Sequence, residues 1–233
     1  MPVPVVLDQV GSTQDVARAW AEEGKPAGVA VIALAQSDGR GRLGRAWVAT
    51  DGALAMSIVL RPNVPTSRLG LLPLAAAVGV RAACSERLRI KWPNDLLAPD
   101  GRKVAGLLAE AEISGGRVRH VILGVGVNVS ASPDGMPAAS LADLGPVPDL
   151  GELAVDVVAE LLAWTTRAFD APDRVLSAWS EASATLGQRV RVANVEGVAE
   201  DVAPDGSLRL RMDDGTLHRV VAGDVEAVRE VRP

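Results

Sequence analysis

The order of hydrophobic and polar positions divides the first 185 residues into short apolar runs and longer amphipathic stretches. Runs rich in Val, Ile and Leu are typical of strands, which we expect at residues 3–7, 29–35, 54–60, 89–92, 103–112 and 118–127. Apolar residues at helical spacing predict helices at residues 12–23, 69–87, 151–169 and 174–184. Residues 93–101 and 130–150 are expected to be loops. Strands that alternate with helices predict a domain of mixed α and β structure.

The pattern changes near residue 186. Beyond it, short apolar runs at residues 190–192, 197–202, 208–212 and 217–221 are separated by turn sequences such as Pro204-Asp205-Gly206. Several short strands joined by tight turns are typical of a small barrel. We therefore expect two domains, a larger one at residues 1–185 and a small β-barrel at residues 186–233.

Composition and charge narrow the class of protein. Apolar residues make up 48% of the chain and charged residues 23%, which is typical of a folded protein. The net charge of −5 argues against DNA as the main partner, because a nucleic-acid backbone needs a broad basic face. Cys84, the one cysteine, is expected to be a small buried hydrophobe. The apolar stretch at residues 69–80 is shorter than the roughly 20 residues of a membrane span, so we expect a cytoplasmic protein with no membrane partner.

The segment at residues 36–47, QSDGRGRLGRAW, is the most informative. Arg40, Arg42 and Arg45 follow one another closely with no acid between them, which predicts a local site for anions. The glycines formally satisfy the G-x-G-x-x-G dinucleotide fingerprint, but no helix begins in the motif and no acid follows about 20 residues on. A solvated basic loop is the other interpretation.

Two further clusters are candidates for chemistry. Lys91-Trp92-Pro93-Asn94-Asp95 precedes the strand that Lys103 begins, and Gly124-Val125-Gly126-Val127-Asn128 ends a buried strand. The alternatives are structural: a solvated lysine at a strand end, and close strand packing with a capping asparagine.

Together these segments carry a resemblance. QSDGRGRLGRAW, KWPNDL at residues 91–96, KVAGLLAE at 103–110 and GVGVNV at 124–129 resemble, in order and spacing, the biotin protein ligases, also called biotin–[acetyl-CoA-carboxylase] ligases. GSTQD at residues 11–15 is similar to the first ligand-binding turn of that family, with Gln14 where an asparagine is usual. Leu43 stands where many members have another basic residue. The resemblance implies an α+β fold, a class II synthetase-like mixed sheet with packed helices, followed by a small SH3-like β-barrel.

The resemblance also implies a two-step reaction. Biotin, the substrate, is activated by ATP with Mg²⁺ to biotinyl-5′-AMP and is then transferred to a lysine of a biotin carboxyl carrier protein. Bringing a carboxylate to a triphosphate is opposed by about 4 kcal/mol per pair of unit charges at roughly 4 Å and an effective dielectric constant of about 20. Fixed cations offset this repulsion, and because the nucleophile belongs to the substrate no catalytic triad is needed.

Site residues follow by resemblance, position by position. The biotin-binding residues would be Ser12, Thr13, Gln36, Gly39, Arg40, Lys103 and Gly106. The ATP-binding residues would be Arg42, Arg45, Trp47, Asn94 and Asn128, and the catalytic residues Lys103, Arg40 and Asp95. No protein ligand to a metal is expected, and Mg²⁺ would sit on the ATP phosphates.

Several roles stay open. Ser12 begins S-x-x-D, so it is also expected to cap a helix. Trp47 is alternatively a tryptophan of the hydrophobic core. Asp95 has three alternative roles: orienting the ribose, orienting magnesium or taking a proton from the incoming lysine. His120 and His218 are expected to be structural. The loop at residues 37–45 is expected to be mobile without ligand.

Three other functions compete with biotin ligation. A lipoate ligase shares the fold and the two-step logic, and a non-catalytic biotin or nucleotide sensor is a different class. A purely structural protein leaves the arginine loop unexplained. Because the first ligand motif begins at Gly11, we expect a short form without an N-terminal helix-turn-helix domain. A homodimer through sheet edges is left open.

Overall fold

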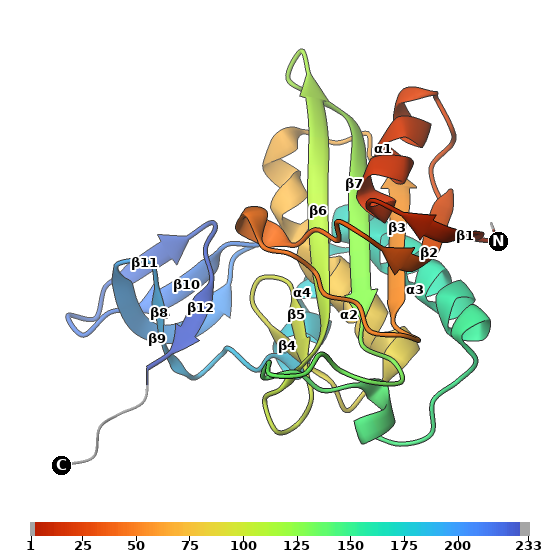
Figure 1. Ribbon diagram of the computed structural model, residues 1–233. Coiled ribbons are helices and arrows are strands. Elements are labelled where there is room, and N and C mark those ends of the chain that lie inside the picture. Colours follow the sequence, from red (N-terminus) through yellow and green to blue (C-terminus); the bar gives the residue numbers. More distant parts are fainter. Residues whose placement is uncertain (1–2, 229–233) are drawn as a thin grey trace.

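The computed structural model describes residues 3–228 and places two sheets side by side (Figure 1). The larger sheet is mixed: β1 and β2 run parallel, and all other neighbours run antiparallel. Its strand order is β1-β2-β3-β7-β6-β5-β4. The strands are β1 (Val5–Val10), β2 (Ala30–Gln36), β3 (Leu54–Leu60), β4 (Arg89–Lys91), β5 (Asp95–Leu97), β6 (Lys103–Ser114) and β7 (Arg117–Val127).

Helices cover both faces of this sheet, which confirms the expected α+β class. They are α1 (Thr13–Glu22), α2 (Leu72–Cys84), α3 (Leu150–Asp170) and α4 (Pro172–Ala182), with short 3₁₀ turns η1 (Arg42–Gly44), η2 (Thr66–Leu71) and η3 (Leu141–Asp143). Alternate residues of β3 show the division, because Ile58 belongs to the main core and Val59 to a smaller cluster with Ala17 of α1. Ser12 caps α1 by accepting a hydrogen bond from the Gln14 backbone nitrogen, so the expected cap is confirmed.

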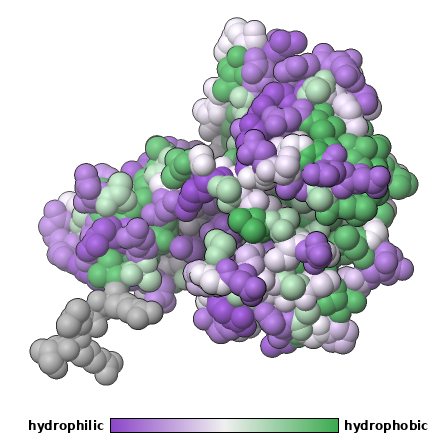
Figure 2. All heavy atoms as spheres, viewed as in Figure 1, coloured by the Kyte–Doolittle hydropathy of each residue, from purple (hydrophilic) through white to green (hydrophobic). Residues whose placement is uncertain are grey.

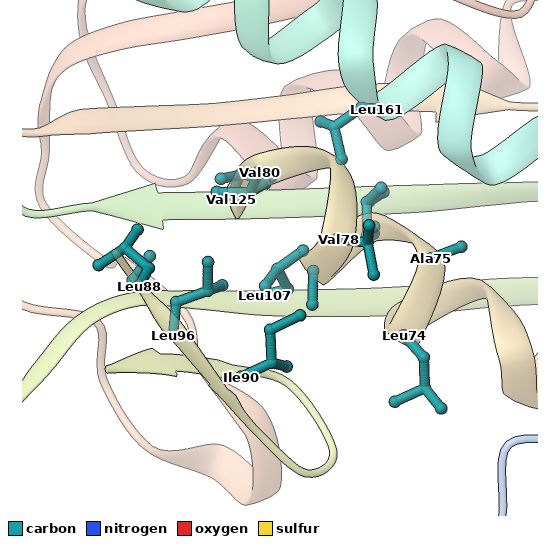
Figure 3. Close-up of a cluster of buried hydrophobic side chains, with 14 of the residues drawn as sticks. Leu74, Ala75, Val78, Val80, Leu88, Ile90, Leu96, Leu107, Val125 and Leu161 are labelled. Carbon is teal, nitrogen blue, oxygen red and sulfur yellow. The ribbon is translucent and has the colours of Figure 1, made fainter. Parts of the chain in front are cut away.

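The main core is built around α2. Its Leu74 and Val78 lie in one cluster with Ile90 and Leu107 of the sheet, and Leu161 of α3 points into this cluster (Figure 3). By length and composition alone, the segment Thr66–Cys84 could cross a membrane. Eight of the 13 residues of α2 are buried, so packing inside the fold accounts for its apolar composition.

The second sheet is antiparallel, with the order β11-β10-β9-β8-β12. Its strands are β8 (Arg189–Val192), β9 (Val195–Val202), β10 (Leu208–Arg211), β11 (Leu217–Val220) and β12 (Val225–Ala227). Figure 2 shows the two lobes in space-filling form, with hydrophilic residues over much of the smaller one. The indole nitrogen of Trp92 donates to the carbonyl of Gly206 at 3.1 Å and so links the two sheets.

Three expectations were wrong in detail. Residues 93–101 are not only a loop, because β5 lies within them and its buried Leu96 pairs with both β4 and β6. The long second helix ends at Cys84 rather than residue 87, since Ser85 is extended. The last strand, β12, was not expected, because only Val225 of its three residues is buried.

Candidate active site

A cleft of about 270 Å³ lies on the α1 side of the larger sheet. Its floor is formed by β6 and β7, and the segment between β2 and β3 crosses over it toward the smaller sheet (Figure 1). The residues expected at a ligand site converge here from distant parts of the chain: Ser12, Thr13, Gln36, Arg40, Arg42, Arg45, Trp47, Asn94, Asp95, Lys103, Gly106 and Asn128.

Gly39 is the exception, because it is buried beside the cleft rather than on its wall. The carbonyl of Gly39 accepts a hydrogen bond from the backbone nitrogen of Trp47 at 2.8 Å, so Gly39 holds the arginine loop in place. The Trp47 ring lies directly on Gly126 of the floor, where a Cβ atom would overlap the indole. Only glycine admits this contact, and the ring is therefore part of the cleft rather than of the core.

Lys103 and Asp95 form an ion pair at one end of the cleft. The Lys103 ammonium lies 2.7 Å from a carboxylate oxygen of Asp95, and the two side chains are 38% and 24% exposed. Lys103 also lies 5.8 Å from the centre of the Trp47 ring. A cation in this position is held by its partner but stays accessible to an anionic ligand.

The arginines of the loop are held by contacts to α1, to Asn94 and to the smaller sheet. Arg40 pairs with Asp15 of α1, and its buried Nε has no hydrogen-bond partner within residues 3–228. Arg42 donates to the side-chain oxygen of Asn94 at 2.8 Å. Asp224, which precedes β12, lies 3.4 Å from Arg42 and 2.7 Å from Arg45, so the smaller sheet reaches the cleft.

The opposite end of the cleft is polar and buried. The Thr13 backbone nitrogen donates to Gln36 Oε1 at 2.8 Å, and the Thr13 hydroxyl lies 3.1 Å from the same oxygen. Ser57 of β3, which is fully buried, lies 2.8 Å from the Thr13 hydroxyl and 2.9 Å from Gln14 Oε1. Hydroxyl and amide groups held this firmly can recognise a small polar ring by hydrogen bonding.

Asn128 supplies an acceptor at the edge of the cleft. Its amide nitrogen donates to the carbonyls of Ala139 and Lys103, at 3.0 and 3.4 Å, which fixes the direction of the amide. Its Oδ1 is buried and finds no partner among the described residues. A buried acceptor without a donor is costly, so a ligand N–H or O–H group would complete it.

Part of the cleft wall was not predicted from the sequence. Ser57 was detectable as a polar residue inside an apolar strand, but the loop with Pro133, Met136 and Pro137 carries no such signal. His120 and His218 lie on β7 and β11, outside the cleft wall. Burial, with a smaller effect from Arg61, lowers the pKa of His120. Within residues 3–228 no three His, Cys, Asp or Glu side chains gather as a metal site.

The chain has relatives over nearly its whole length. It is 37% identical to the biotin–[acetyl-CoA-carboxylase] ligase of Mycobacterium tuberculosis, over 96% of this chain and 88% of that protein. It is 40% identical to the bifunctional ligase/repressor BirA of Bacillus spizizenii, but that match spans 57% of this chain and only 42% of the relative's length. The fold is similar to that of a biotin protein ligase from Aquifex aeolicus in complex with biotin and ATP, with a TM-score of 0.78, 24% identity, and 99% and 100% of the two chains covered.

Two families match defined parts of the sequence. The biotin protein ligase C-terminal domain matches residues 185–227, which include the smaller sheet. The biotin/lipoate A/B protein ligase family matches residues 6–128, which include all seven strands of the larger sheet apart from the first residue of β1. This second match covers more than half of the chain, and the protein belongs to the biotin/lipoate A/B protein ligase family.

Proposed function

We propose that the protein is an ATP-dependent ligase that activates biotin as biotinyl-5′-AMP and transfers it to a lysine of a biotin carboxyl carrier protein. One observation carries the proposal: a single cleft joins a buried hydrogen-bonding end to a row of fixed cations. The first suits the cyclic urea of biotin, and the second suits a carboxylate beside a triphosphate. The relative from Mycobacterium tuberculosis supports the same activity.

In the first step, a biotin carboxylate oxygen attacks the α-phosphorus of ATP. The bond from that phosphorus to the bridging oxygen breaks, and pyrophosphate leaves with its electron pair. Lys103 and Arg40 are proposed as the catalytic cations between the carboxylate and the α-phosphate, while Arg42 and Arg45 bind the leaving phosphates. Their positive charge reduces the repulsion between the reactants and stabilises the charge that develops.

The nucleotide is proposed to lie on the Trp47 side of the cleft, with Asn94 and Asn128 beside it. Adenine offers an exocyclic N–H group, which is the donor that the orphaned Oδ1 of Asn128 lacks. Guanine has a carbonyl at the same place and would put two acceptors together. ATP is therefore preferred over GTP. Mg²⁺ would be bound by the ATP phosphates and would reduce their negative charge.

In the second step, the amine of the carrier lysine attacks the acyl carbon of biotinyl-5′-AMP. The bond to the phosphate oxygen breaks, AMP leaves, an amide forms and the amine gives up a proton. Asp95 lies beside Lys103 and lines the cleft, so its carboxylate can take this proton. The same position allows it to orient the ribose or magnesium, and the two half-reactions separate these roles.

Biotin-dependent exchange of pyrophosphate into ATP tests the proposal. We expect exchange with biotin, no exchange with lipoate, and no competition when lipoate is added to the biotin reaction. Lys103→Ala should lose exchange, whereas Lys25→Ala, outside the cleft, should keep it. Exchange that requires lipoate instead of biotin would favour a lipoate ligase. Biotin binding without exchange would favour a non-catalytic sensor.

The location and assembly of the protein are part of the same proposal. We propose a cytoplasmic location, where the enzyme would meet the carrier subunit of a biotin-dependent carboxylase. If the protein forms a homodimer, we propose that β1, the outer strand of the larger sheet, lies at the interface. Val5 and Val6 of this strand are 43% and 57% exposed. Hydrophobic residues gather on that side of the molecule (Figure 2). Sedimentation at several concentrations tests this edge.

A further inference from the structure

We propose that Glu110, which lies outside the cleft, sets the hydrogen-bond polarity of the biotin subsite by acting through Gln14 and Ser57. The inference rests on the proposed function and adds a positioning residue to it. Glu110 is on β6 and Gln14 is the second residue of α1, so two distant segments meet behind the cleft wall. Their contact joins the amide nitrogen of Gln14 to a carboxylate oxygen of Glu110 at 2.8 Å.

The chemistry of the carboxylate fixes the direction of this contact. An ionised carboxylate accepts hydrogen bonds and donates none, so it selects the NH₂ end of the Gln14 amide. Arg18 donates to the same oxygen of Glu110 at 2.8 Å and keeps the carboxylate in place. Gln14 is only 2% exposed, and its amide is therefore held in one of its two orientations.

That orientation determines the Ser57 hydroxyl. The Oε1 atom of Gln14 can only accept, and Ser57 lies 2.9 Å from it with a single hydrogen to give. Once Ser57 donates to Gln14, its oxygen can only accept from the Thr13 hydroxyl, 2.8 Å away. The hydrogen of Thr13 thus points into the protein, toward Ser57.

The cleft consequently presents an acceptor and a donor at fixed places. The Thr13 oxygen offers a lone pair, and the Gln36 amide nitrogen is left to donate because Gln36 Oε1 already accepts from the Thr13 backbone. A cyclic urea carries N–H donors on either side of a carbonyl acceptor, which matches this arrangement. A dithiolane ring, as in lipoate, offers neither group. Glu110 therefore acts as a specificity-determining residue for the urea without touching it.

Pyrophosphate exchange as a function of biotin concentration tests the chain of contacts. Glu110→Ala removes the acceptor and allows the Gln14 amide to flip. The KM for biotin should therefore rise about tenfold, the usual effect of losing one hydrogen bond. The KM for ATP and kcat should change less than twofold. Glu110→Gln keeps an acceptor oxygen beside Gln14 and Arg18, so its KM for biotin should stay within about threefold of the wild-type value. Glu112→Ala, two residues further along β6, is the matched control.

A double mutant separates this role from a general structural one. Ser57→Ala breaks the connection to Thr13, so adding Glu110→Ala to it should raise the biotin KM no further. Desthiobiotin keeps the urea and lacks the sulfur ring. Glu110→Ala should raise the KM for desthiobiotin by the same factor as the KM for biotin.

Additive effects in the double mutant would overturn the inference, and so would a Glu110→Gln enzyme as poor as Glu110→Ala. An unchanged biotin KM in Glu110→Ala would overturn it while leaving the proposed function intact. Absence of biotin-dependent exchange in the wild type would overturn the proposed function, and this inference with it.

Discussion

The side chains of Lys103 and Asp95 meet at 2.7 Å inside the cleft although they begin different strands, β6 and β5. The pair keeps the lysine charge fixed before any ligand arrives. A partner this close also prevents the flexible lysine from turning into solvent, which makes Asp95 important even in the first half-reaction.

Asp95→Asn is expected to lower kcat for pyrophosphate exchange about tenfold, because Lys103 loses the charge that holds it in place. Lys103→Gln should lower it about 100-fold or more, the usual cost of removing one group that stabilises transition-state charge. The double mutant should be no slower than Lys103→Gln alone, since Asp95 acts on exchange through the lysine. A fully additive loss would show that Asp95 has a separate role in this step.

Asp224 lies between Arg42 and Arg45 and competes with phosphate for both. The pairs are partly exposed, with Arg45 61% and Asp224 38% accessible, so each contributes little in water. Asp224→Asn should therefore lower the KM for ATP only about two- to fivefold. Cleavage of the loop by trypsin should become faster in the variant and slower again with biotin and ATP. Glu226→Gln, on β12, should leave both measurements unchanged.

Gly79 of α2 allows α3 to approach closely. A Cβ atom at this position would lie 2.9 Å from the carbonyl oxygen of Glu160, and backbone cannot move aside as a side chain can. Gly79→Ala gains about 1 kcal/mol of helix propensity. It loses about 1–3 kcal/mol from overpacking. We expect the second effect to win, and chemical denaturation should show a lower free energy of unfolding. A more stable variant would mean that the two helices separate easily.

Sequence patterns predicted well the parts of the fold whose neighbours are close in the chain. The adjacent strands β6 and β7, expected at residues 103–112 and 118–127, are one example, and the Ser12 cap of α1 is another. Both depend on local backbone chemistry. The strand β5 was missed because its few residues are held by β4 and β6 rather than by their own propensity.

The site shows the same division. The arginine loop and the lysine were recognisable as candidate chemistry because unpaired charges and glycines stand out in a sequence. The contact between Gln14 and Glu110 was not predictable, since it joins residues 96 positions apart and depends on the register of β6 against α1. Asp224 was missed for the same reason, because only the docking of the smaller sheet brings it to the arginines.

His120 gives the stability of the protein a defined pH dependence. Because burial lowers its pKa in the folded state, the unfolded chain binds more protons as the pH falls below the ordinary histidine value of about 6.5. The contribution of His120 to the free energy of unfolding should therefore decrease on acidification from that point, whereas above it this contribution is fully present. His120→Asn should remove this decrease, which urea denaturation between about pH 5 and about pH 8 would measure. His218→Asn should keep it.

Trp92 has a consequence for how the molecule melts. Its side chain is 2% exposed, its indole nitrogen reaches Gly206, and its backbone nitrogen donates to Thr185 at 2.9 Å. We propose the two domains at residues 1–185 and 186–233, yet neither can separate without exposing this ring. A single calorimetric transition is therefore expected, and the shorter segment would lose its order together with the longer one on heating.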